Sequence, residues 1–352
     1  NMKILKKINI FRRKLTKLLT KNIGNTQINE NYDLVNKEDI KRILICRPNH
    51  RLGNQLLITP IVQELIEIFP NSKIDLFVKG NIASVIFKNY DNIDTIISLP
   101  KEHFKHIFKY LWGWIRLKQK RYDLVINTTG NSSSGKLSTK FANSKHKCFG
   151  DCNNDSVQNL KNKDHIHIAK CPVYALRNYL SKIGIDINKT KIPSLDIKLS
   201  NLEIAEGKKL LKELVYNDKK TICLFTYATG DKCYSETWWL ELYEALTVKY
   251  TNYNIIEILP VENISKINFK APTFYSKDIR QICSFIANTD IFVGADSGMM
   301  HLASASHTTT IGLFSITNTE VYQPYYNRNI GINTTNMNTN GIIEVIENVL
   351  SK

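Results

Sequence analysis

The fold of this 352-residue chain is decided at residues 291–305, which read IFVGADSGMMHLASA. The stretch opens with an apolar run of strand length, and the chain then enters a helix at Ser297 and Gly298. A polar turn therefore joins the carboxyl end of a strand to the N-terminus of a helix. In open parallel sheets ligands bind at turns of this kind, because the start of a helix offers free backbone N–H groups.

Short apolar runs alternate with amphipathic helical segments on the N-terminal side of this stretch. A first series begins at Arg42 with RILICRP and continues through KIDLFVKG and YDLVINTTG, and a second begins near Thr221 with TICLFTYATG. This alternation predicts parallel strands covered by helices on both faces. We therefore expect an α/β protein with two doubly wound, Rossmann-like lobes. The expected segments are a helix and linker at 1–38, lobes at 39–190 and 191–335, and a C-terminal helix at 336–352.

Positive charge is concentrated near the N-terminus. Between residues 3 and 21, apolar residues recur at helical spacing and the other face carries Lys and Arg without any acid. About half of the formal net charge of +16 lies in this segment. The pattern predicts a basic amphipathic helix that lies on an anionic membrane surface. A solvated helix that packs on the rest of the protein is the alternative.

Charge and cysteine usage narrow the class of protein. The excess of Lys and Arg favours an anionic partner, but no recognition motif for nucleic acid accompanies it, so we expect no nucleic-acid partner. Seven cysteines, an odd number, are scattered through apparent strands and helices. They indicate a reducing compartment rather than a disulfide scaffold. Without a long apolar window or signal peptide, the sequence predicts a cytoplasmic protein that binds the membrane peripherally.

Two loops could hold a diphosphate. At the turn in 294–305, Asp296 and Ser297 can cap the helix, Gly298 lets a ligand approach the backbone, and His301 lies one turn further on. Plain N-capping beside a buried core histidine is the alternative here. The loop TYATGDKCYSETWW at 226–239 offers the hydroxyls of Thr226 and Thr229 and the charge of Lys232. Taken singly, Lys232 is also compatible with an ordinary surface lysine.

Together these loops resemble those of the bacterial heptosyltransferases that build the lipopolysaccharide core, which are inverting glycosyltransferases of family 9 with the GT-B fold. The resemblance covers about residues 41–335 and is carried by DSGMMHLASA, TIGLFSITN, YQPY, DKCYSETWW and IFPNSKIDLFV. It implies a donor lobe that binds a nucleotide-diphosphate sugar, with ADP-heptose as the family's donor. It implies an anionic saccharide or glycolipid acceptor of lipopolysaccharide, O-antigen or capsule. The implied donor-binding residues are Thr226, Thr229, Lys232, Glu262, Asp296, Ser297, Gly298, Met299 and His301.

The sequence departs from the family pattern at the start of the first helix. Where the family usually has Gly-Asp, with the carboxylate as candidate general base, this chain has Gly53-Asn54. An amide cannot accept the proton of the acceptor hydroxyl at neutral pH. We expect His50 to replace it, because an unperturbed imidazole has a pKa near 6.5. An acceptor-phosphate contact or a plain loop histidine is the alternative for His50, and Arg47, Arg51 and Gly53 are expected at the acceptor.

Other features of the sequence bear on the reaction and on alternative functions. We expect direct displacement that needs no metal and no cofactor, since the chain has no obvious Asp-x-Asp loop for a divalent cation. A nucleotide-sugar-binding protein without transferase activity and a nucleotide-sugar epimerase remain the alternatives. The stretch GNSSSGKLS at 130–138 nearly matches a P-loop, but Leu137 replaces the Mg²⁺-binding hydroxyl. Spacing also disfavours a zinc site among His146, Cys148, Cys152, His165, His167 and Cys171.

Overall fold

The chain divides into two compact units in a computed structural model. The described residues are 17–18, 20–21, 23, 33–102, 105–150, 152 and 163–351. Unit 1 comprises Asn1–His50, Ile61–Ser84 and Tyr90–Pro193, and unit 2 comprises Arg51–Pro60, Val85–Asn89 and Ser194–Lys352. The predicted basic helix at 3–21 lies almost entirely outside the described residues and stays a prediction.

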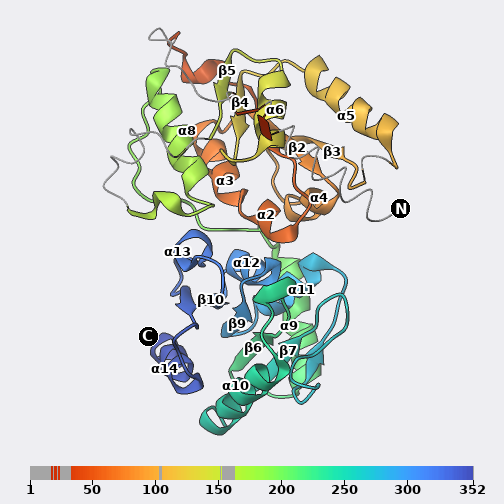
Figure 1. Ribbon diagram of the computed structural model, residues 1–352, viewed down its shortest axis with the longest axis vertical. Helices are drawn as coiled ribbons and strands as arrows, with labels where there is room; N and C mark the ends of the chain where they lie inside the picture. Colours follow the sequence, from red (N-terminus) through yellow and green to blue (C-terminus); the bar gives the residue numbers. More distant parts are fainter. Residues whose placement is uncertain are drawn as a thin grey trace. The chain divides into compact units, whose positions relative to one another are not determined.

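Unit 1 is built on a five-stranded parallel sheet with the strand order β3-β2-β1-β4-β5 (Figure 1). Its three central strands are buried along almost their whole length, as expected for parallel strands that helices cover on both faces. The chain from residue 37 to residue 182 contains η1 Lys37–Asp39, β1 Arg42–Arg47, α2 Leu52–Leu56, α3 Thr59–Ile68, β2 Lys73–Lys79, α4 Ile82–Ile86, β3 Ile93–Leu99, α5 Ile107–Gln119, β4 Leu124–Asn127, α6 Ser133–Phe141, β5 His146–Cys148, η2 Lys163–Ile166 and α8 Cys171–Lys182. Of these, α2, the first residues of α3 and the last residues of α4 group with unit 2.

The face of the unit 1 sheet that α5 and α6 cover has an aromatic core. Leu117 of α5 and Tyr122 are buried against strand residues that include Phe77 and Leu99. The ring of Trp114 meets the ring of Phe77 edge to face, with 5.2 Å between the centroids. This geometry suits the opposite partial charges of ring edge and ring face. The buried face of α5 is thus fixed on the sheet.

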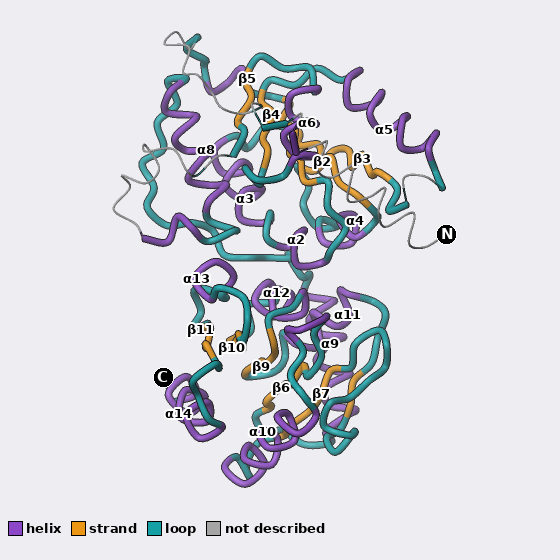
Figure 2. The backbone as a smooth tube through the Cα atoms, viewed as in Figure 1, coloured by secondary structure: helices purple, strands orange, loops and turns teal. Residues whose placement is uncertain are grey.

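Unit 2 contains a six-stranded parallel sheet in the order β11-β10-β9-β6-β7-β8. Figure 2 shows the strands in orange and the helices in purple. This order places β6 beside β9 and β9 beside β10, so the loops that follow these three strands share one edge. The elements are α9 Asn201–Val215, β6 Thr221–Phe225, η3 Gly230–Lys232, α10 Glu236–Lys249, β7 Asn254–Ile258, β8 Thr273–Phe274, α11 Ile279–Ile286, β9 Ile291–Ala295, α12 Gly298–Ala305, β10 Thr309–Phe314, α13 Thr319–Tyr322, β11 Ile330–Asn333 and α14 Thr339–Leu350.

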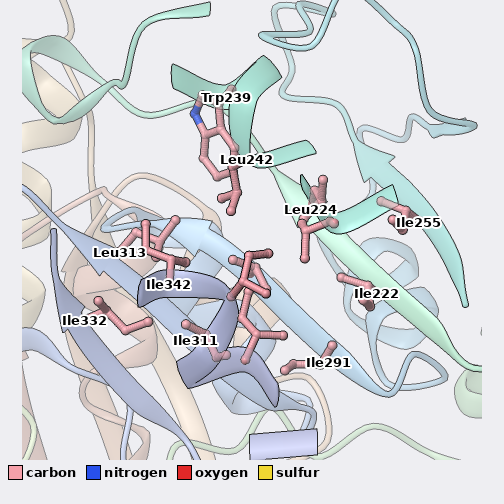
Figure 3. Packing of buried hydrophobic residues seen from close by; sticks show 14 of the residues in the cluster. Ile222, Leu224, Trp239, Leu242, Ile255, Ile291, Ile311, Leu313, Ile332 and Ile342 are labelled. Atoms are coloured by element: carbon pink, nitrogen blue, oxygen red, sulfur yellow. The ribbon is translucent and has the colours of Figure 1, made fainter. Parts of the chain in front are cut away.

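The core of unit 2 is a continuous aliphatic cluster around one indole. Trp239 of α10 is fully buried, and Figure 3 shows it above strand residues such as Leu224 and Leu313. Ile342 of α14 joins the same cluster, so the C-terminal helix belongs to the core of this unit. The alternating pattern of the sequence therefore produced two doubly wound units, and the prediction of the fold class is confirmed for the described residues.

The structure contains one disulfide among the described cysteines, which the sequence did not predict. Cys152 is bonded to Cys171, and their Cα atoms lie 6.0 Å apart. The sequence gives no sign of this, because the pair depends on where the preceding loop meets the start of α8. Among the described residues, the remaining cysteines are free, and burial raises the pKa of the Cys46 and Cys148 thiols to about 11.

No helix in the described part of the chain combines the length and apolar character that crossing a membrane requires.

Candidate functional site

The candidate site lies at the carboxyl edge of the unit 2 sheet. The loops after β6, β9 and β10 emerge there side by side, because the three strands are neighbours in register. The loop after β6 carries Lys232, the turn after β9 carries Asp296 and Ser297, and the loop after β10 carries Thr317. This is the edge at which open parallel sheets bind ligands.

A lysine, an aspartate and a threonine meet at this edge. The Lys232 ammonium donates to Oδ2 of Asp296 at 2.5 Å, and the Thr317 hydroxyl donates to the same oxygen at 2.5 Å. Asp296 is 5% exposed, whereas the Lys232 side chain is 37% exposed. The carboxylate is therefore held in place by two donors, and it orients a cation that still reaches solvent.

The Lys232 ammonium also has an aromatic neighbour. Its Nζ lies 5.7 Å from the centroid of the Tyr322 ring, within the range of a cation–π contact. Lys232 ends the short η3 helix, and Gly230 begins that helix with a φ of 65°, a backbone conformation that favours glycine. The loop geometry therefore directs the lysine toward Asp296 and is not that of an unconstrained surface lysine.

The N-terminus of α12 lies directly after Asp296. The Ser297 side chain caps the helix by accepting a hydrogen bond from the Met300 N–H at 3.4 Å. The N–H groups of Gly298 and Met299 precede the first intrahelical partner that could accept from them. The positive end of the helix dipole and these groups favour an anion beside the Lys232–Asp296 pair.

Gly298 has a second role that the sequence did not predict. A Cβ at Gly298 would lie 3.2 Å from the backbone nitrogen of Gly53 and 3.3 Å from Cβ of Leu52, so helix α2 packs directly on the start of α12. A Cβ at Gly53 would lie 2.9 Å from Cδ2 of His301. Gly53 therefore allows a close helix–helix approach within unit 2. His301 is 5% exposed beneath this contact.

Thr226 is placed differently from the other predicted donor residues. It is buried, and its hydroxyl donates to Oε1 of Glu257 at 2.5 Å. The Ser265 hydroxyl donates to the other oxygen of Glu257 at 2.6 Å, and the Lys266 N–H donates to the Thr226 hydroxyl at 3.1 Å. Burial raises the pKa of the Glu257 carboxyl, and the two hydroxyl donors oppose this rise. This network ties the loop after β6 to the loop after β7.

The two remaining predicted donor residues, Thr229 and Glu262, are both exposed. Thr229 precedes η3, and Glu262 lies in the loop after β7 that the Glu257 network holds at Ser265. Three residues of the site were missed by sequence reasoning, namely Glu257, Thr317 and Tyr322. A charged residue inside the apolar run NIIEI was a usable signal for Glu257, because a buried carboxylate requires hydrogen-bond partners.

The predicted acceptor residues fall in both units. Arg47 and His50 belong to unit 1, while Arg51, Gly53 and Asn54 belong to unit 2. Arg47 ends β1, is 7% exposed and donates to the Thr129 hydroxyl. His50 is exposed and Asn54 is half-buried in α2. Their roles in acceptor binding and proton transfer stay predictions.

The turn after β9 and helix α12 lie in a region that is similar to known proteins. The model of glycosyltransferase family 9 (heptosyltransferase) matches residues 274–344, a range that includes the turn at Asp296 and all of α12. Lipooligosaccharide heptosyltransferase 2 of Campylobacter jejuni serotype O:6 is 24% identical over 284 residues, which cover 79% of this chain and 83% of that protein.

Solved structures share the fold of the chain. A glycosyl transferase of family 9 from Veillonella parvula superimposes with a TM-score of 0.69 at 15% identity, covering 90% of this chain and 99% of that one. The E. coli heptosyltransferase WaaC with ADP gives a TM-score of 0.62 at 16% identity, covering 88% of this chain and 99% of WaaC. These likenesses establish the GT-B architecture predicted from the sequence.

Proposed function

We propose that the chain is a member of glycosyltransferase family 9, the heptosyltransferase family, and that it transfers a heptose or related sugar from a nucleotide-diphosphate donor to a surface saccharide. The acceptor class is the saccharide of lipooligosaccharide or lipopolysaccharide, O-antigen or capsule. The main support for the proposal is that Lys232 and Thr317 both hydrogen-bond Asp296 beside the N-terminus of α12. A cation and free N–H groups at one point suit a diphosphate.

ADP-heptose is the donor that we propose. E. coli WaaC, which shares the fold, has been solved with ADP and with ADP-2-deoxy-2-fluoro heptose. In this chain Lys232 and Thr229 would contact the phosphates, and Glu262 would contact the ribose. Ser297, Gly298, Met299 and His301 would surround the diphosphate and the sugar. Thr226 would act on the donor through Glu257 and the loop that Glu257 holds, since its own hydroxyl already donates to that carboxylate.

The reaction is a single displacement with inversion. The acceptor hydroxyl oxygen forms a bond to the anomeric carbon while the bond from that carbon to the diphosphate oxygen breaks. His50 takes the hydroxyl proton in place of the carboxylate that Asn54 replaces. Lys232 and the first N–H groups of α12 stabilise the charge that develops on the departing ADP. Asp296 keeps the ammonium of Lys232 in position for this step.

The other predicted contacts complete the proposal. Unit 2 takes the donor and unit 1 the acceptor. The anionic groups of the acceptor bind Arg47 of unit 1 and also Arg51, which groups with unit 2. The reaction takes place in the cytoplasm, at the inner face of the inner membrane, with residues 3–21 as one attachment. Similarity to heptosyltransferases favours transfer over the epimerase alternative. A binding protein without transferase activity is separated from this proposal by experiment.

The test measures ADP release from ADP-heptose with and without a lipooligosaccharide acceptor that lacks its heptose. Transfer predicts release that depends on the acceptor, whereas a binding protein releases nothing and an epimerase converts the donor without any acceptor. The variant Lys232→Ala should lose most of this activity. Lys270→Ala is the matched control, because it also removes an ion pair of unit 2, the 2.9 Å contact with Glu244. Equal activity of the two variants would contradict the assignment of Lys232.

A further inference from the structure

Helix α5 of unit 1 has apolar side chains on two opposite faces. One face packs on the sheet through Tyr110, Trp114 and Leu117, with Gly113 allowing a close approach to Leu99. A Cβ at Gly113 would lie 2.6 Å from Cδ2 of Leu99. These positions recur at helical spacing and account for the attachment of α5 to its unit.

The opposite face of α5 carries a second apolar stripe that does not contribute to the core. Phe108 is 85% exposed, Leu111 51%, Trp112 59% and Ile115 45%. Their spacing of three, four and seven residues places the four side chains on one line along the helix surface. In Figure 1, α5 runs along the outer margin of unit 1, away from α8. Isolated exposed apolar residues are ordinary, but a stripe of this size indicates an interaction surface.

Cations border this stripe on both sides. Lys109 and Arg116 lie toward one side of the helix and Lys118 toward the other, and all three are exposed. The sequence from Lys105 to Arg121 contains no Asp or Glu. Apolar side chains along the middle of a helix face with cations along its borders are the arrangement of helices that lie in the surface of an anionic membrane.

The surface continues onto the neighbouring helix α6. Lys118 lies over the ring of Phe141, with 5.4 Å from Nζ to the centroid. Phe141 is 41% exposed and Leu137, one turn earlier in α6, is 39% exposed. Lys136 and Lys140 accompany them in the same helix. Two adjacent helices of unit 1 therefore present apolar groups among cations.

We propose that the exposed stripe of α5, extended by α6, docks unit 1 on an anionic lipid surface. The aromatic and aliphatic groups of Phe108, Leu111, Trp112 and Ile115 enter the boundary between headgroups and acyl chains, and the flanking cations bind lipid phosphates. The helix lies in the plane of the membrane and does not cross it. Charge complementarity decides the partner, since a protein surface matching this one would have to be both apolar and acidic. The inference is independent of residues 3–21 and goes beyond the proposed transfer reaction.

The test compares binding of the full chain and its variants to vesicles. Vesicles of phosphatidylcholine with phosphatidylglycerol are sedimented with the protein, beside vesicles of phosphatidylcholine alone. The double variant Phe108→Ser with Trp112→Ser should bind the anionic vesicles at least ~10-fold more weakly, because burying each aromatic ring is favourable. The control is Leu202→Ser with Val248→Ser, which removes residues of unit 2 that are 83% and 80% exposed. It should bind as the unchanged chain does.

A second readout reports on the stripe itself. Lipids brominated in the acyl chain should quench part of the tryptophan emission, and Trp112→Phe should abolish that part. Equal vesicle binding by the double variant and the control, or quenching that persists in Trp112→Phe, would overturn the proposal. The proposal would also be overturned if the unchanged chain did not bind vesicles but formed dimers that the double variant cannot form, because the stripe would then contact a second copy of the chain. Acceptor-dependent transfer to a delipidated acceptor should be unchanged in the double variant, which separates this proposal from that of function.

Discussion

Substituting Gly53 by alanine tests the contact between α2 and α12. The added Cβ would lie 2.9 Å from Cδ2 of His301 and 3.3 Å from Cα of Gly298. Neither neighbour is a flexible side-chain end, since His301 is 5% exposed and Gly298 contributes backbone. Overpacking of this kind costs about 1–3 kcal/mol. Both helices begin at the candidate site, so the strain also reaches the N–H groups proposed to bind the diphosphate.

The matched control is Gly341→Ala in α14. Its Cβ would lie 2.9 Å from Cγ of Met337, the middle of a side chain that can rotate away. Alanine favours a helix over glycine by about 1 kcal/mol at both positions, so this gain cancels in the comparison. Gly53→Ala should therefore be less stable than Gly341→Ala by about 1–3 kcal/mol.

Thermal unfolding of the two variants measures this difference. For a unit of this size, 1 kcal/mol corresponds to about 2–4 °C, so the melting temperatures should differ by about 2–12 °C. Gly53→Ala should also bind ADP more weakly than Gly341→Ala does. Equal melting temperatures with equal ADP affinity would refute the close packing of α2 on α12 and the role given to Gly53.

Two further substitutions, Arg280→Met and Asp196→Asn, lead to three predictions. Arg280→Met removes a buried guanidinium that hydrogen-bonds Glu203. Urea unfolding should show that the free energy of unfolding falls by about 3–5 kcal/mol. A decrease below about 1 kcal/mol would contradict the buried pair. Arg280 lowers the pKa of Glu203 to about 2, so this carboxylate stabilises the fold above pH 4.5 and the stabilisation is lost as the pH falls toward 2. In acid unfolding, the stability of Arg280→Met should not depend on the pH in this way. The hydrogen bond to Asp196 raises the pKa of His307. The stabilisation of the fold by this pair is therefore complete below pH 6.5 and is lost as the pH rises through the raised pKa. Asp196→Asn should abolish this pH dependence in melting curves between pH 5 and 9, and an unchanged dependence would exclude the pair.

Local patterns of the sequence were sufficient for the sheet edge and its capped helix. The order of apolar run, polar turn and helix predicted β9, Asp296, Ser297 and α12, because each part depends on residues near it in the chain. Lys232 also lies where the loop pattern indicated, and its contact with Asp296 agrees with the predicted grouping of the two. These features required no knowledge of distant partners.

Features that depend on strand order or on distant helices could not be predicted. Thr317 reaches Asp296 because β10 lies beside β9, and Gly53 meets His301 because α2 packs on a helix more than two hundred residues later. The bond between Cys152 and Cys171 depends in the same way on the path of a loop. Chain order also assigned residues 51–60 to the first lobe, whereas their contacts group them with unit 2.

The exposed stripe of α5 could be predicted only in part. Apolar residues occur on nearly every side of the segment at 107–119, so the sequence alone does not show which of them face the sheet. The structure separates Trp114, which packs on Phe77, from Trp112, which is exposed. The exposed side chains therefore define the proposed membrane surface, which the sequence pattern alone does not show.

The most direct test of the central claim is calorimetric titration of the chain with ADP and with adenosine. If the diphosphate binds between Lys232 and the first N–H groups of α12, Lys232→Ala should weaken ADP binding about 10-fold or more and leave adenosine binding unchanged, since a charge-assisted hydrogen bond contributes about 1.5–3 kcal/mol. Equal ADP affinity in Lys232→Ala and the unchanged chain would contradict the account.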